Sequence, residues 1–179
     1  MKNILFTIII LISFVSFGQL NELKLGNNLK FKKNNIEFSF KEPLSFEQTS
    51  QSYSSDNSNI IVSFLNRQNK ILIEAYTTPI PEKFYSDADV FFSNKEKFEN
   101  LMNQMLPKPF NKIISYKIIK IGSQSFLEVS LISHNIQKQT NWITLYKNNL
   151  INIYGTTTTS NFSSIESFLS KFKNSIRIN

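Results

Sequence analysis

The sequence predicts an α+β domain in which an antiparallel sheet of about six to seven strands is sandwiched by helices. Three observations lead to this fold class. Short β-rich runs recur along the chain, tight turns separate the last four of them, and two segments carry apolar residues at helical spacing. Short turns join antiparallel neighbours, and helices at two points of the chain can cover a sheet. The length of 179 residues and the 41% hydrophobic content suit one folded domain.

Residues 1–18 have the layout of a secretory signal peptide. Met1-Lys2-Asn3 provides a positive start, and Ile4 to Val15 is an apolar stretch of 12 residues. Small residues then precede Gln19 at the spacing of a cleavage site. The stretch is shorter than the ~20 residues that cross a bilayer. We therefore expect a periplasmic or secreted protein with no membrane span after cleavage.

Residues 19–35 are expected to form a flexible leader, and residues 36–179 a single domain. The leader is polar and rich in Asn and Lys, without sustained periodicity. It holds the densest group of cations, Lys30-x-Lys32-Lys33, which a solvated arm would explain.

The first strands of the domain follow this leader. Ile36 to Phe40 alternates apolar and polar residues, which is typical of a half-buried strand, and Pro43 ends it. Ile60 to Leu65 and Lys70 to Tyr76 predict a hairpin. The closely spaced prolines Pro79 and Pro81 then disfavour both helix and strand.

A long helix is expected next, between Ser86 and Met105. Ser86 is a suitable N-cap, with Asp87 and Asp89 in the first turn, where the helix dipole favours negative charge. Apolar residues follow at steps of three and four, until Pro107 stops the helix.

Four strand-like runs then predict an antiparallel meander. Their ranges are Ile113 to Ile121, Gln124 to Ser133, Lys138 to Tyr146 and Leu150 to Thr157. In the third run Trp142 lies on one face while Ile143 and Leu145 lie on the other. Both faces of that strand are therefore expected to be covered.

A second helix is expected from Asn161 to Lys173. Ser163-Ser164-Ile165-Glu166 has the spacing of a capping box, in which the first Ser caps the helix and Glu166 reaches back to it. Apolar residues at helical spacing form its buried face, namely Ile165, Phe168, Leu169 and Phe172.

The order of elements resembles the PsbP-like superfamily of exported domains, which includes Mog-type and DcrB-type proteins. The resemblance spans Ile36 to Ile176. It is carried by the Ile36 to Phe40 strand with Pro43, the helix after Pro81, Ile121-Gly122 before Phe126 to Val129, and the terminal segment Phe162 to Ile176. The chain departs from many relatives in lacking a Trp near Phe46. The resemblance implies a non-catalytic module that binds or stabilises other proteins or, in some branches, lipids, and it transfers no functional residue.

Composition removes most catalytic chemistries. The chain has no Cys, a single His and four Gly, and the phosphate-binding motifs GxGxxG and GxxxxGK[ST] are absent. Three constellations are left to consider. His134 could act as a general base oriented by Glu128, Asp87 and Asp89 could contribute to a Ca²⁺ site, and Glu74 with Glu128 could form a carboxylate pair.

Each of these constellations has a simpler structural explanation. His134 is explained by a position in a turn, and Asp87 and Asp89 by positions in the first turn of a helix. Two glutamates on strands are common in any sheet, so their presence alone does not indicate a catalytic pair. We therefore expect no enzyme, and we assign no catalytic, cofactor-binding or metal-binding residue.

Polar loops and tyrosines are the candidate recognition elements. The loops are Thr156 to Ser160 and Gln51 to Ser58, although ordinary solvent-exposed loops would look the same. Tyrosine joins apolar area to a polar group, so it is a common interface residue. The candidates are Tyr53, Tyr85, Tyr116, Tyr146 and Tyr154.

The leading functional hypothesis is an exported, non-catalytic accessory protein that associates with a protein partner in the bacterial envelope. The alternatives are a carrier of a lipid or other apolar ligand and an immunity-type inhibitor of a secreted toxin. Nucleic-acid binding is disfavoured by the expected export and by the type and distribution of the basic residues. Of 20 Lys and Arg residues only Arg67 and Arg177 are Arg, the residue that base and phosphate recognition favours, and the lysines are scattered.

Overall fold

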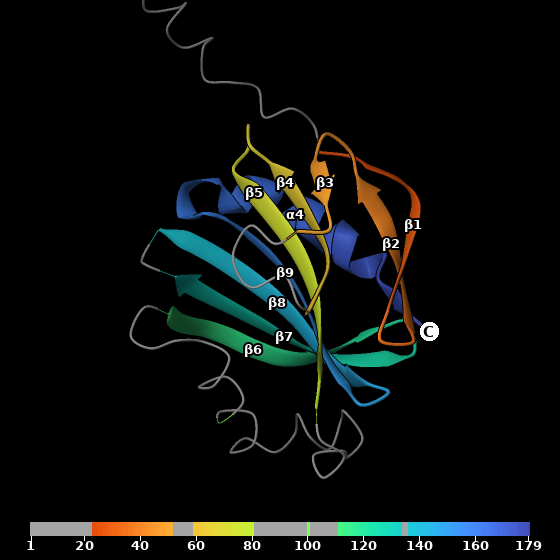
Figure 1. Ribbon diagram of the computed structural model, residues 1–179. Coiled ribbons are helices and arrows are strands. Elements are labelled where there is room, and N and C mark those ends of the chain that lie inside the picture. The colour runs from red at the N-terminus through yellow and green to blue at the C-terminus, as the bar shows by residue number, and fades with distance from the viewer. Residues whose placement is uncertain (1–22, 52–58, 81–99, 101–110, 134–135) are drawn as a thin grey trace, which may run out of the picture.

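The computed structural model describes residues 23–51, 59–80, 100, 111–133 and 136–179 of the chain. Figure 1 shows the strands as a broad sheet with one long helix packed on one side of it. The strands are β1 (Leu25–Lys33), β2 (Ile36–Pro43), β3 (Glu47–Thr49), β4 (Ile60–Asn66), β5 (Ile71–Pro79), β6 (Asn111–Ile121), β7 (Gln124–Ser133), β8 (Gln137–Tyr146), β9 (Asn149–Thr158) and β10 (Arg177–Ile178). The helices are the 3₁₀ turn η3 (Thr159–Asn161) and α4 (Phe162–Asn174).

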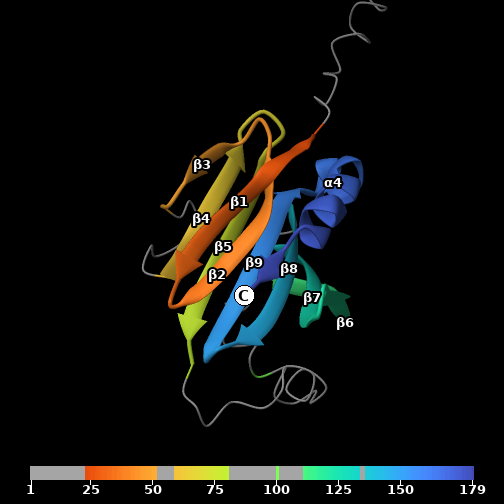
Figure 2. The ribbon, with the colours of Figure 1, turned by 90° about the vertical axis from the view of Figure 1, so that its right-hand side faces the viewer.

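The strands form two sheets. The larger has seven strands in the order β3-β4-β5-β9-β8-β7-β6, and the smaller has three in the order β1-β2-β10. All the strand pairs are antiparallel. The small sheet and α4 lie over the same face of the large sheet (Figure 2). We call this the helix face and the opposite one the far face.

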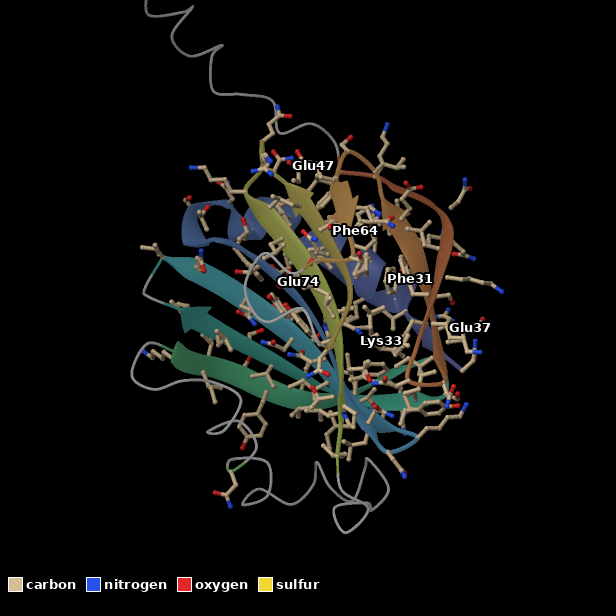
Figure 3. All side chains as sticks on the ribbon, in the orientation of Figure 1. Phe31, Lys33, Glu37, Glu47, Phe64 and Glu74 are labelled. Atoms are coloured by element: carbon tan, nitrogen blue, oxygen red, sulfur yellow. The ribbon has the colours of Figure 1, made fainter. Side chains whose placement is uncertain are left out.

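Aromatic rings fill the space between these layers. Phe40 of β2 packs edge-on against Phe64 of β4 at a centroid distance of 5.9 Å, and against Phe172 of α4 at 5.4 Å. Phe172 in turn lies 6.4 Å from Trp142 of β8. Phe31 and Phe64 lie between the two sheets in Figure 3. Each layer thus contributes rings to one continuous core, and their burial is the main stabilising term.

Helix α4 approaches the large sheet closely at β9. A Cβ added at Gly155 would lie 2.7 Å from Cδ2 of Leu169, so only glycine leaves room for the helix there. The N-cap is Asn161, without a cap hydrogen bond from its side chain, and the helix begins at Phe162. The predicted capping box is therefore wrong, because Ser163 already lies inside the first turn.

Strand β1 occupies much of the segment that was expected to be a flexible leader. Phe31 pairs in register with Phe38 of β2, and β1 turns into β2 through Asn34 and Asn35, which have φ of 51° and 59°. Two consecutive residues with positive φ are typical of a tight hairpin turn, and Asn accepts that conformation. The apolar side chains of β1 are spaced between lysines and polar residues, so composition hid the strand.

Two further features differ from the expected helix-sandwiched sheet. The second sheet, with the two-residue β10 at its edge, supplies much of the cover on the helix face, and α4 is the one long helix of the described ranges. The helix predicted from Ser86 to Met105 falls almost wholly outside the described residues. The helix face is therefore covered by the small sheet and α4 together, and the predicted covering by helices alone is wrong for this face.

The predicted hairpin and meander are confirmed. β4 and β5 pair directly, and β6 to β9 follow one another in the sheet as they do in the chain. The expected break near Pro79 comes later than predicted, because Thr77, Thr78 and Pro79 still pair with β9. Trp142 and Ile143 lie on opposite faces of β8, as predicted, and both are 1% exposed.

Candidate functional site

Several candidate residues fall outside the described part of the chain. These are His134, Asp87, Asp89, Tyr53, Tyr85 and residues 52–58 of the Gln51 to Ser58 loop. Their expected roles remain predictions.

The two candidate glutamates lie on opposite faces of the large sheet. Glu74 sits between Ile73 and Ala75, whose side chains belong to the core on the helix face, so Glu74 points to the far face. Glu128 accepts a hydrogen bond from Lys173 of α4, so it points to the helix face. Their strands are separated by β9 and β8, a lateral distance of about 14 Å at ~4.8 Å per strand. These positions exclude the carboxylate pair.

Glu128 joins the sheet to the helix. Its carboxylate accepts hydrogen bonds from Trp142 Nε1 and Lys173 Nζ, both at 2.9 Å, and it forms an ion pair with Lys117 at 3.2 Å. Burial by itself raises the pKa of Glu128, but hydrogen bonds from Lys173, Trp142 and Lys117 and the charge of Lys173 outweigh it, so the pKa is lowered. A carboxylate held ionised in this way is structural, because its charge is already neutralised.

Glu74 is held by hydroxyl groups on the far face. Ser63 Oγ donates to Oε1 at 2.5 Å, Tyr76 Oη donates to Oε2 at 2.6 Å, and Tyr154 Oη also donates to Oε2. The Glu74 side chain is fully buried, and Figure 3 shows it on β5. Because these donors come from β4, β5 and β9, the network fastens three neighbouring strands to one another.

A second polar group continues along the same face. Tyr154 is paired in register with Asn141 of β8, whose Oδ1 accepts a hydrogen bond from Gln139 at 2.9 Å. Asn141 is 2% exposed, and its Nδ2 has no hydrogen-bond partner in the structure, nor has Oδ1 of Asn152. One donor and one acceptor are thus left over near the centre of the far face, where a buried water is the ordinary solution.

Strand β6 carries the most exposed apolar group of side chains among the described strands. Ile113, Ile114, Tyr116 and Ile118 are between 41% and 49% exposed, and we call them the β6 patch. Tyr116 and Ile118 lie beside Val129 and Leu127 of β7, which are buried on the far face. Among the described strands β6 has a neighbour on one side only, so it forms an edge of the large sheet (Figure 1). An exposed apolar edge strand can pair with another chain.

The other recognition candidates turn out differently. Of the three candidate tyrosines in the described ranges, only Tyr116 is exposed, whereas Tyr146 is partly buried and Tyr154 is 8% exposed. The Thr156 to Ser160 run is not a loop, because β9 continues to Thr158 and Thr157 is 2% exposed. Sequence reasoning missed the β6 patch as a group. The only sequence feature of the patch is an apolar run with lysines at intervals, and a central strand can have the same pattern.

The described residues contain neither a metal-binding arrangement nor a membrane-spanning helix. No group of three or more His, Cys, Asp or Glu lies close enough to hold a metal ion within these ranges. No helix among them is long and apolar enough to cross a membrane.

Comparisons with known proteins find similarity in structure alone. No family model matches the chain, and no curated protein matches its sequence. The solution structure of cyanobacterial PsbP (CyanoP) from Synechocystis sp. PCC 6803 is similar with a TM-score of 0.59 at 10% identity, over 91% of this chain and 99% of that one. LpqN of Mycobacterium tuberculosis, described as involved in cell envelope biogenesis, is similar with a TM-score of 0.56 at 7% identity, over 89% and 92%. The chain therefore shares the fold of CyanoP and of LpqN, which agrees with the PsbP-like fold that its sequence predicted.

Proposed function

We propose that this protein is an exported, non-catalytic accessory protein that binds a partner protein in the cell envelope. Three observations support the proposal. Residues 1–18 have the layout of a signal peptide, the fold is shared with CyanoP and with LpqN, and the two glutamates considered for catalysis are both held in networks that stabilise the sheet.

The β6 patch is the observation that carries the proposal. Four large apolar side chains stand partly exposed along one edge strand of 11 residues. An exposed apolar group of this size on one strand is typical of an interaction surface. An extended segment of a partner could add to β6 as a further strand and cover these side chains.

The charge of β6 argues against a second copy of this chain as that segment. Asn111–Ile121 holds Lys112, Lys117 and Lys120 and no acidic residue. A second copy of β6 would bring lysines close to lysines, which is unfavourable for a pair of antiparallel strands. A partner segment with apolar side chains on the far face would cover the patch, and an acidic residue opposite the exposed Lys112 would add charge complementarity.

The space between α4 and the sheet gives less support to the carrier of an apolar ligand. Rings of Phe40, Trp142 and Phe172 occupy this region, and Leu169 lies directly against Gly155. A ligand there would have to displace close-packed side chains, which is costly. An immunity-type inhibitor would be one special case of the protein-binding proposal.

The test is an affinity pull-down of the mature, C-terminally tagged chain from its host's envelope fraction, read by mass spectrometry. The test variant carries Ile114→Asp and Ile118→Asp. The matched control is Leu44→Asp, since Leu44 is 38% exposed in the turn between β2 and β3, away from β6. We expect the wild type and the control to retain a stoichiometric protein that the test variant loses. Equal retention by the test variant would overturn the role of the patch, and a copurified lipid without protein would overturn the proposed function.

A further inference from the structure

A basic hollow formed by elements other than β6 is a second candidate binding site. Its volume is about 830 Å³, and it lies between the start of β1, the middle of β2 and the C-terminal end of α4. Figure 2 shows these elements side by side, with the C-terminus next to them. The lining includes Lys24, Lys41, Lys171 and Arg177, together with Leu23 and Leu25 and several amide and hydroxyl side chains.

The described lining of this hollow carries positive charge without a carboxylate. Its lining contains four cations and no carboxylate. Within the described ranges no Asp or Glu forms an ion pair with Lys41, Lys171 or Arg177. Cations gathered in a concave surface raise the local positive potential and the local concentration of anions.

The helix dipole accounts for only part of the cluster. Lys171 lies in the last turn of α4, where a cation is favoured by the nearby carbonyl groups. Lys24 and Lys41 are brought to the hollow by the pairing of β1 with β2, and neither belongs to the helix. The hollow thus collects its cations from more than one element.

Arg177 is held in a defined position at this site. Its Nη1 donates to the carbonyl oxygens of Asn174 at 2.9 Å and Ile176 at 2.6 Å. No described residue takes a hydrogen bond from Nε or Nη2. A guanidinium that is fixed at one nitrogen and open at the others suits an oxyanion with several oxygens.

We infer that the hollow binds a phosphate ester. The phosphate would contact Lys41, Lys171 and Arg177, and the organic part would lie against Leu23 and Leu25. A bare ion would fill little of the volume, which lies in the ~300–1,000 Å³ range of organic ligand sites. The ester could be a soluble metabolite or the headgroup of a phospholipid, because both present the same group.

The test measures binding of two probes to the mature chain. One probe is glycerol phosphate in solution, followed by calorimetry and by amide chemical shifts in residues 171–177. The other is vesicles of phosphatidylcholine with and without phosphatidylglycerol, followed by cosedimentation. Binding of the first probe identifies a soluble ester, and binding only to the anionic vesicles identifies a headgroup.

The test variant replaces Lys41→Gln and Lys171→Gln together. Its matched control replaces Lys32→Gln and Lys70→Gln, which removes the same charge from exposed positions outside the hollow. We expect the test variant to bind at least about tenfold more weakly, and the control to change less than about threefold. Equal weakening in both variants, or no binding of either probe by the wild type, would overturn the inference. The β6 variants should bind both probes normally, so this result is independent of the proposed function.

Discussion

The two faces of the large sheet each contain a glutamate, and the two are stabilised differently. On the helix face, Glu128 is neutralised by the ammonium groups of Lys173 and Lys117. On the far face, Glu74 is fully buried and accepts hydrogen bonds from three hydroxyl groups. The first network joins a helix to the sheet, whereas the second joins strands within the sheet. The difference shows that a strand glutamate can be structural in two ways, neither of which needs a substrate.

The largest expected effect tests the far-face network. Replacing Glu74→Ala leaves three hydroxyl groups without their acceptor in a buried region, which should lower the free energy of unfolding by about 3 kcal/mol. Glu74→Gln keeps an acceptor oxygen and should cost less. Chemical denaturation monitored by circular dichroism measures both, with Glu166→Ala as the control because Glu166 is exposed on α4. If Glu74→Ala proves no more harmful than Glu166→Ala, the hydroxyl network does not stabilise the strands.

A smaller effect, with a characteristic pH dependence, is expected on the helix face. The pKa of Glu128 is lowered in the folded state, from about 4.3 in an unfolded chain. Its stabilising contribution is therefore complete above that unfolded pKa, and it is lost as the pH falls through the folded pKa. Glu128→Gln should be less stable than the wild type by about 1 kcal/mol at pH 7.

Thermal unfolding of both proteins between pH 7 and pH 3 measures this difference. The two melting temperatures should converge as the pH falls below the unfolded pKa of about 4.3 and through the lower pKa of the folded state, where the wild-type carboxylate takes up a proton. A difference that stays constant or grows toward acid would contradict the ion-paired state of Glu128.

The smallest effect on stability is expected at the β6 patch. Ile114 is 49% exposed, so Ile114→Ser should change the free energy of unfolding by no more than about 0.5 kcal/mol. The buried neighbour Val129→Ser is the contrasting variant, because its side chain is fully enclosed. Denaturation midpoints of the two variants give the comparison. A large loss at Ile114 would mean that the patch belongs to the core and is not a free binding surface.

The candidate site could be predicted only in outline. Sequence reasoning singled out Tyr116 as one of five tyrosines, but it could not group Tyr116 with its exposed isoleucine neighbours. Exposure of β6 follows from its place at the end of the strand order, and that order depends on pairings between distant strands. The basic hollow could not be predicted either, because its cations come from the residue before β1 and from β2, α4 and β10.

Local patterns by themselves determined the strands of the meander, the β4–β5 hairpin, the terminal helix and the PsbP-like class. Each depends on a periodicity of side chains or a tight turn within one short segment. Tertiary structure decided the rest. Only the packing shows that residues expected to form a flexible leader form β1, which pairs with β2. It also shows that a second sheet covers the helix face and that the side chains of Glu74 and Glu128 lie on opposite faces of the large sheet. Those outcomes depend on contacts between residues far apart in the chain, which no short window of sequence records.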